Sequence, residues 1–164
     1  MHETREDRQN QRRVMEFIQR NLLARTPFVG AGFRYTEIPT EPDDSKPDFD
    51  IWMYHLHVGV VEIKCRTGRY NADYFLQHGY MLDSRKLNSL QKSDKMGFKA
   101  LFAFESSDGR VFYTTMQRLM ANRDSLQKAD PEMMMTTNHG KDKRKVPFRG
   151  YIIPLSLFEE IRND

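Results

Sequence analysis

The sequence lacks the features that mark membrane proteins and disulfide-rich secreted proteins. Cys65 is the one cysteine among 164 residues, so an internal disulfide framework is excluded and a reducing compartment is favoured. No apolar run approaches the roughly 20 residues of a membrane span, and the N-terminus is too polar for a signal peptide. We therefore expect a cytoplasmic protein without a membrane partner.

Signatures of several other enzyme and metal-binding classes are also missing. There is no GxxxxGK[ST] phosphate loop and no dinucleotide-binding fingerprint. His55 and His57 have a spacing that can bind a transition metal, but no cysteine pair or third histidine lies at a matching interval. Cys65 is expected on the core side of a strand, which argues against a catalytic thiolate.

The composition favours a single domain spanning residues 1–164. Apolar residues make up 38% of the chain and charged residues 30%, and this length suffices for a central sheet with flanking helices. The formal net charge is +3, which permits a polyanionic partner.

The apolar pattern predicts an α/β fold with a mixed central sheet flanked by helices. Strands are expected near residues 33–38, 48–54, 58–65, 99–105 and 110–113, with shorter ones at 77–82 and 151–153. Helices are expected at about 4–24, 84–95 and 116–121, and a closing helix is expected to begin at Ser156. The segment 65–75 shows no clear periodicity and is expected to form a loop.

The stretch from Lys46 to Arg66, KPDFDIWMYHLHVGVVEIKCR, holds acidic residues beside a proline, a short apolar run, and then Glu62-Ile63-Lys64 at the end of a second apolar run. Side chains alternate between the two faces of a strand, so Glu62 and Lys64 project together. Asp48 and Asp50 share one parity near the start of the preceding strand. If the two strands pair as a hairpin, an aspartate comes close to Glu62.

Two carboxylates and a lysine at one point need a physical reason, because like charges about 3–4 Å apart repel. A hard divalent cation supplies that reason, since Mg²⁺ takes oxygen ligands and is usually held by one or two carboxylates. Such a metal polarises a phosphoryl oxygen and activates a water. Lys64 would orient that water or offset charge on the phosphate. The pattern therefore suggests phosphodiester hydrolysis.

An aspartate at Pro47-Asp48 or Asp50-Ile51, followed a dozen or so residues later by Glu62-Ile63-Lys64, resembles the motif of the PD-(D/E)xK nuclease superfamily. This superfamily includes restriction endonucleases, Holliday junction resolvases and phage nucleases. The resemblance implies a restriction endonuclease-like α/β core and a Mg²⁺-dependent DNA endonuclease, with Mn²⁺ as a substitute. Branched DNA such as a Holliday junction is one conceivable substrate, and the host cytoplasm is the expected location if the protein is phage-encoded.

The resemblance also assigns roles to individual residues. The aspartate and Glu62 would bind the metal together with the backbone carbonyl of Ile63, and Lys64 would assist the nucleophile. Asp48 and Asp50 both remain candidates. Asp50 is favoured, because a ligand directly opposite Glu62 should lie at the start of the paired strand.

Some relatives in the superfamily add a further acid from their first helix. Glu16 and Asp7 are the candidates for that position here, and the sequence does not decide between them.

Basic residues outside the motif are candidates for contacts with DNA phosphates. They lie in the segment after the Glu-x-Lys motif, on the helix that begins near Ser84, and in the densest basic cluster of the chain. They are Arg66, Arg69, Lys86, Lys143, Arg144 and Lys145. A homodimer would place two active sites on opposite strands of a two-fold symmetric substrate.

A rival hypothesis is a noncatalytic nucleic-acid or protein-binding module that retains the nuclease fold. Its mark would be the loss of the aspartate, the glutamate or the lysine, and all three are present here.

Overall fold

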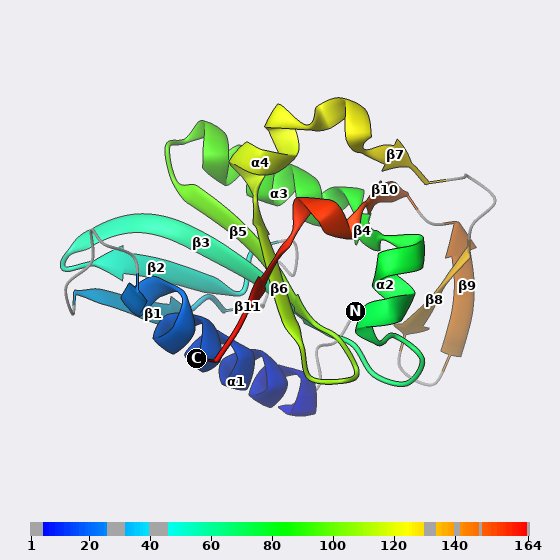
Figure 1. Cartoon of the computed structure of the whole chain (residues 1–164), viewed down its shortest axis with the longest axis horizontal. Coiled ribbons are helices and arrows are strands. Elements are labelled where there is room, and N and C mark those ends of the chain that lie inside the picture. Colours follow the sequence, from blue (N-terminus) through cyan, green and yellow to red (C-terminus); the bar gives the residue numbers. More distant parts are fainter. Residues whose placement is uncertain are drawn as a thin grey trace.

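The computed structural model describes residues 5–25, 32–39, 46–129, 134–139, 142–147 and 149–163; of residues 25, 134–139 and 142–147 it describes the backbone alone. A six-stranded sheet in the order β1-β2-β3-β5-β6-β11 forms the centre (Figure 1). Its strands are β1 (Phe33–Glu37), β2 (Phe49–Met53), β3 (Leu56–Cys65), β5 (Lys99–Glu105), β6 (Val111–Thr115) and β11 (Glu159–Ile161).

The neighbouring strands of this sheet are antiparallel except β3 and β5, which are parallel. Parallel neighbours need a crossover connection. Here the crossover contains helix α2 (Ala72–His78), strand β4 (Tyr80–Asp83) and helix α3 (Ser84–Lys95).

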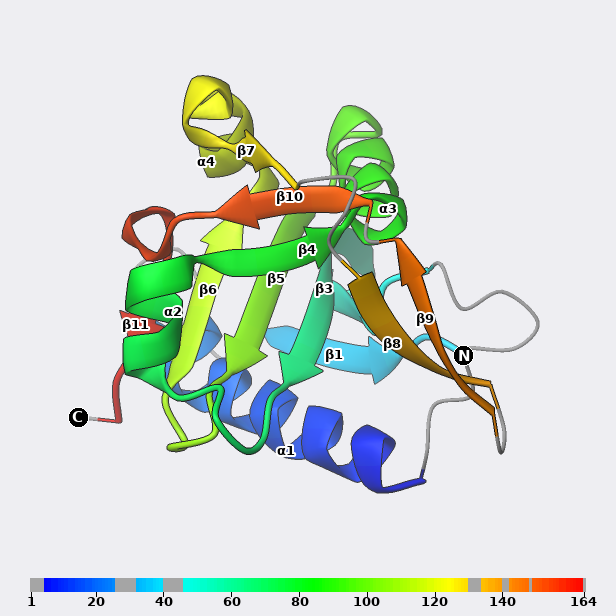
Figure 2. The same ribbon diagram turned by 90° about the vertical axis from the view of Figure 1, so that its right-hand side faces the viewer.

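Helices cover both faces of the central sheet (Figures 1 and 2). Helix α1 (Arg5–Asn21) lies on one face. The other face carries α2, α3, α4 (Met116–Ala121) and a small sheet of β4, β10 (Gly150–Ile153) and β7 (Gln127–Lys128). A separate two-stranded sheet consists of β8 (Met134–His139) and β9 (Asp142–Pro147). The described residues also form three 3₁₀ helices: Leu23–Arg25, Arg123–Ser125 and Leu155–Leu157.

The alternation of side chains along β5 divides the interior into two cores. Leu101 and Ala103 pack in the core beneath α1, whereas Phe102 and Phe104 pack in the core beneath α2 and α3. Because β5 is covered on both faces, it consists of a nearly continuous apolar run. The same alternation along β3 directs Ile63 toward α1 and leaves Glu62 on the opposite face.

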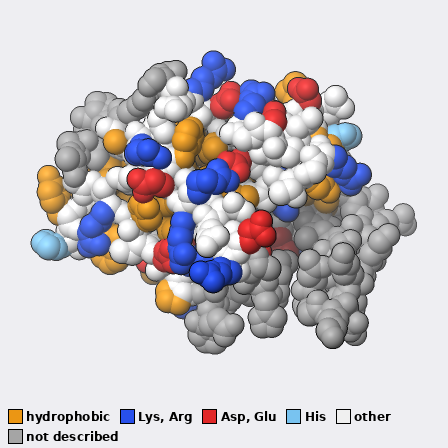
Figure 3. Space-filling model, turned by 90° about the horizontal axis from the view of Figure 1, so that it is seen from below, with side chains coloured by type: hydrophobic (Ala, Val, Ile, Leu, Met, Phe, Trp, Pro, Cys, Tyr) orange, Lys and Arg blue, Asp and Glu red, His pale blue; other side chains and the backbone are white. Residues whose placement is uncertain are grey.

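The arginines of α1 are largely paired with acids. Arg12 forms an ion pair with Glu37 of β1, and both terminal nitrogens of Arg13 lie 2.7 Å from the carboxylate of Glu105. Figure 3 looks onto the face that α1 covers, and basic and acidic side chains alternate there. This face therefore carries charges of both signs and is not uniformly basic.

The expected α/β architecture, with a mixed central sheet flanked by helices, is confirmed. Each of the five main strands expected from the sequence is present, and the expected helices at 84–95 and 116–121 match α3 and α4. Among the described residues, none of the helices combines the length and apolarity needed to span a membrane.

The prediction of a loop at 65–75 is wrong from Ala72 onward, where α2 begins. The Asn71 side chain caps this helix by accepting a hydrogen bond from the Tyr74 N–H at 2.9 Å. Gly79 follows the helix with φ 72°, a conformation that favours glycine. The cap and the glycine were visible in the sequence, but the apolar residues between them are too few to show a helical period.

The prediction of a closing helix after Ser156 is also wrong, because the chain adds strand β11 to the edge of β6. In the structure Phe158 packs in one core and Ile161 in the other. Residues three apart share a face in a helix but point to opposite faces in extended chain. Extended chain therefore lets Phe158 and Ile161 reach the two separate cores.

Candidate active site

The pairing of β2 with β3 determines which aspartate meets Glu62. Phe49 pairs with Val61 and Asp50 with Val60, so one further step along the ladder brings Asp48 beside Glu62. The Ile63 N–H donates a hydrogen bond to Oδ2 of Asp48 at 2.7 Å. The expectation that Asp50 lies opposite Glu62 is therefore wrong, and Asp48 takes that position.

Asp50 is held elsewhere by a histidine. Its Oδ1 lies 2.7 Å from Nε2 of His57. The His57 ring in turn packs against Trp52 and Phe98, with ring centroids 4.9 and 4.3 Å away. Asp50 thus belongs to an aromatic and polar cluster near the β2–β3 turn.

Asp48 and Glu62 are both buried, with 3% and 1% of their surface exposed. Oε1 of Glu62 lies 3.2 Å from Nζ of Lys64 and 3.3 Å from Nζ of Lys86, which α3 supplies. Neither carboxylate oxygen of Glu62 accepts a hydrogen bond from the part of the chain described. A buried carboxylate oxygen without a partner is unfavourable, because it has lost its contacts with water.

The two carboxylates perturb each other. Burial is the main cause that raises the pKa of Asp48 to about 7, and the charge of Glu62 adds to it. The pKa of Asp48 is lowered in turn by the charge of Lys64, by the hydrogen bond from the Ile63 N–H and by the charge of Lys86. For Lys64, burial lowers the pKa, but Glu62 and Asp48 together raise it more, so its pKa is raised overall and the ammonium stays charged at neutral pH.

This donor set fits a hard divalent cation. Asp48 and Glu62 offer carboxylate oxygens, and those of Glu62 accept no hydrogen bond from the described residues. The N–H and C=O of one residue in a strand point to the same side. The Ile63 carbonyl therefore faces the same side as its N–H, which contacts Asp48.

Within the described ranges no group of three His, Cys, Asp or Glu side chains is placed to hold a metal. The set of two carboxylates and a carbonyl matches Mg²⁺, which keeps several waters, better than a metal held entirely by side chains.

The first helix brings a cation to the site. Nη1 of Arg8 lies 3.6 Å from Oδ1 of Asp48. Glu16 accepts a hydrogen bond from the Tyr35 hydroxyl at 2.7 Å. It lies on α1, whose core is on the other face of the sheet from Glu62. The further acid stays unassigned.

The expected phosphate-binding residues are in different environments. Lys86 lies at the carboxylates, and its Nζ also donates to the Lys46 carbonyl at 3.3 Å. Arg66 donates to the Tyr80 hydroxyl, and the exposed Arg69 packs over the Tyr70 ring at 5.3 Å. Lys143, Arg144 and Lys145 lie on β9, and their side chains are outside the described part of the structure.

Sequence reasoning missed Arg8 and Tyr80 as residues of the site. Each reaches it from an element far away in the chain, so no local pattern marks them. Their position depends on how α1 and β4 pack against the central sheet.

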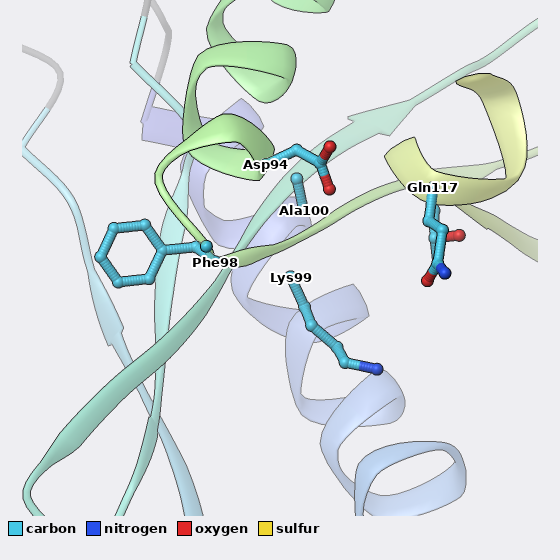
Figure 4. Close-up of a pocket in the computed structure, with 7 residues that line it drawn as sticks. Asp94, Phe98, Lys99, Ala100 and Gln117 are labelled. Atoms are coloured by element: carbon cyan, nitrogen blue, oxygen red, sulfur yellow. The ribbon is translucent and has the colours of Figure 1, made fainter.

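A separate shallow pocket of about 160 Å³ lies between the end of α3 and the start of α4 (Figure 4). Asp94, Lys99 and Gln117 are among its lining residues, and their side chains extend in different directions (Figure 4). It contains neither carboxylate of the candidate site.

No protein-family model and no curated protein matches this sequence. Among solved structures, the chain is similar to a 1.6 Å structure of Hjc, a Holliday junction resolvase from the archaeal hyperthermophile Archaeoglobus fulgidus. The two share 13% sequence identity with a TM-score of 0.41, over 84% of each chain. Residue roles in this chain therefore rest on its own geometry.

Proposed function

We propose that this protein is a Mg²⁺-dependent DNA endonuclease that hydrolyses phosphodiester bonds, with Mn²⁺ as a substitute. One observation carries the proposal: two buried carboxylates, Asp48 and Glu62, meet beside two lysines, and neither oxygen of Glu62 accepts a hydrogen bond from the described residues. Asp48 replaces Asp50 as the proposed metal ligand, because Asp50 is paired with His57.

Asp48, Glu62 and the Ile63 carbonyl would hold the metal. When bound, a divalent metal polarises a phosphoryl oxygen and lowers the pKa of a coordinated water. The residues of the chain set the position of both carboxylates. The Ile63 N–H fixes Oδ2 of Asp48, and Lys64 and Lys86 hold Oε1 of Glu62.

Lys64 is the residue proposed to assist the nucleophile. Its side chain is 30% exposed, so one side remains open to solvent while Nζ contacts Glu62. Because its pKa is raised, it acts as a charged hydrogen-bond donor that orients water or offsets charge on the phosphate. Removal of a proton from the water falls to another group or to solvent.

The surroundings of the carboxylates favour an anionic substrate. Lys64 and Lys86 contact Glu62, and Arg8 lies between Asp48 and Glu37, so each carboxylate of the site has a cation beside it before any metal binds. A phosphodiester is the anion that such a site would attract. We further propose that Arg69 and the basic residues of β9, Lys143, Arg144 and Lys145, contact DNA phosphates.

The substrate class within DNA is also a proposal. A four-way junction has two-fold symmetry, and a homodimer would bring two active sites to its opposite strands. A noncatalytic module with the same fold is the second hypothesis, and the intact set of Asp48, Glu62 and Lys64 argues against it.

We predict that the wild-type protein cleaves plasmid DNA or a four-way junction in the presence of Mg²⁺ or Mn²⁺. Glu62→Ala and Lys64→Ala should reduce the rate by at least about 100-fold, because each removes a group that acts on the transition state. The measurement is the initial cleavage rate on linear duplex, plasmid and junction substrates.

Asp94→Ala is a suitable control, because Asp94 lines the separate pocket and contacts neither carboxylate. It should cleave at the wild-type rate. Equal activity of the wild type, Glu62→Ala and Lys64→Ala would sink the mechanism, and absence of cleavage by the wild type with either metal would sink the function.

A further inference from the structure

Arg66 is the first residue after β3 and lies two residues beyond Lys64, the last residue of the Glu-x-Lys motif. It has the same parity as Glu62 and Lys64, so in extended chain its Cα lies roughly 7 Å from that of Lys64. The Arg66 N–H donates to the Glu105 carbonyl at 2.9 Å, which fixes this position to the end of β5.

The guanidinium of Arg66 has one hydrogen-bond acceptor among the described residues. Nε and Nη2 both donate to the Tyr80 hydroxyl, at 3.1 and 2.8 Å. A guanidinium has five N–H donors, so most of them remain available. No carboxylate lies within 4.0 Å of Arg66 in the described part of the chain, although the side chain is only partly exposed.

Other arginines of this protein have the carboxylate partners that Arg66 lacks. Arg13 donates two hydrogen bonds to the Glu105 carboxylate, both at 2.7 Å. Arg110 donates two to the Glu160 carboxylate, at 2.8 and 3.0 Å. A partly buried cation without a counter-ion is unfavourable unless an anion completes the site. The two-pronged geometry of a guanidinium matches the oxygens of a phosphate.

Tyr80 is a rigid support for Arg66. It is 2% exposed and packs against Phe75, Phe102 and Phe104, with ring centroids 4.5 to 5.5 Å apart. The Arg66 guanidinium also lies over the Tyr80 ring, 5.3 Å from its centroid, and Tyr80 belongs to the core on the face of the central sheet that carries Glu62 and Lys64.

We infer that Arg66 binds a backbone phosphate of the nucleic acid beside the scissile bond, and that Tyr80 is a positioning residue that holds the guanidinium toward it. This inference rests on the proposed function and identifies the residue of this chain that fixes the substrate relative to Lys64.

The test is DNA binding in EDTA, where no cleavage occurs, measured by fluorescence anisotropy of a labelled duplex over a range of salt concentrations. Each phosphate contact on duplex DNA contributes a slope of about −0.9 to log K against log salt. Arg66→Gln should flatten the slope by about that amount and weaken binding several-fold. Arg66→Lys should keep the slope and bind more weakly than wild type, because the ammonium retains the charge but not the fork.

Tyr80→Phe removes the hydroxyl alone and should weaken binding several-fold without changing the slope. Tyr113→Phe is the matched control. The Tyr113 hydroxyl donates to Glu159 at 2.8 Å and contacts neither Asp48 nor Glu62, so this variant should bind DNA as the wild type does. Circular dichroism checks that each variant is folded.

Wild-type slope and affinity in a folded Arg66→Gln would overturn the inference. If Arg66→Gln does not fold, wild-type affinity in both Arg66→Lys and Tyr80→Phe would overturn it, and weakened binding in both would support it. A wild-type protein that binds no DNA overturns this inference together with the proposed function. Wild-type cleavage combined with unchanged binding by the Arg66 variants overturns the inference alone.

Discussion

Asp48 is a carboxyl group that water barely reaches. Burial, with a contribution from the charge of Glu62, raises its pKa to about 7. In an unfolded chain an aspartate has a pKa near 3.9. Between these two values the folded, metal-free protein keeps a proton that the unfolded chain has lost.

We predict that this proton makes the stability of the metal-free protein fall as pH rises from about 4 to about 7, relative to Asp48→Asn. The folded state binds more protons than the unfolded state in this window, so the free energy of unfolding decreases by up to about 1.4 kcal/mol per pH unit. Below the window the group is neutral in both states, and above it the group is charged in both, so the effect levels off.

Thermal melts of the wild type and Asp48→Asn in EDTA, at one-unit pH steps, measure the effect as the difference between the two Tm values. A difference that stays constant over the whole window would contradict the raised pKa of Asp48.

The alternation of side chains along one strand was sufficient to predict that Glu62 and Lys64 lie together, and their charged atoms are 3.2 Å apart. It could not choose between Asp48 and Asp50, because both have the same parity. That choice depends on the register between β2 and β3, which shifts between Ile51 and Trp52 and thereby places Asp48 opposite Glu62. The contact of Arg66 with Tyr80 likewise depends on the path of the crossover.

Helix α2 is one of the elements that the sequence pattern missed, and it lies in the crossover that leads from Arg66 to Tyr80. It has seven residues, so its end groups matter more than they would in a long helix. Asn71 caps its start, and Asp108 accepts a hydrogen bond from the Ala72 N–H at 3.0 Å.

Replacing the cap should destabilise the protein. We predict that Asn71→Ala lowers the free energy of unfolding by about 1 kcal/mol, because the Tyr74 N–H loses its acceptor. For a chain of this size the expected decrease in Tm is about 2–4 °C, measured by circular dichroism.

Asn88→Ala is the matched control, because Asn88 is exposed within α3 and caps nothing. Alanine is the better helix former there, so Tm should stay the same or rise slightly. Asn71→Ser should retain most of the wild-type Tm. Equal Tm values for Asn71→Ala and the wild type would show that the cap does not stabilise α2.

The closing segment shows a second limit at the scale of elements. Phe158 and Ile161 have a spacing that suits one face of a helix, yet they serve opposite cores. Which of the two conformations forms depends on the free edge of β6, and a local pattern contains no information about that edge.

At the scale of the whole molecule, apolar patterning was sufficient to predict the class of fold. The six-stranded sheet contains the five main strands expected from the sequence. Short strands were expected near β4 and β10, but their pairing in the small sheet was not predictable, because Tyr80–Asp83 and Gly150–Ile153 lie far apart in the chain. Such pairing is decided by packing over the core around Phe102 and Phe104.

The layers also explain where the candidate site lies. Glu62 and Lys64 are on the face of the central sheet that α3 and the small sheet cover. Lys86 approaches from α3, and Arg8 approaches Asp48 from α1. Cations from two layers thus converge on a pair of carboxylates from neighbouring strands.

The proposed nuclease activity depends on a divalent metal site formed by Asp48 and Glu62. Titration calorimetry of the wild type with Mn²⁺ or Mg²⁺ tests it most directly, beside Asp48→Asn, Glu62→Gln and Asp50→Asn. We predict that the first two variants lose at least about tenfold in affinity, because each removes one of two carboxylate ligands. Asp50→Asn should bind the metal as the wild type does. Wild-type affinity in Asp48→Asn or Glu62→Gln, or loss of binding in Asp50→Asn alone, would contradict the account.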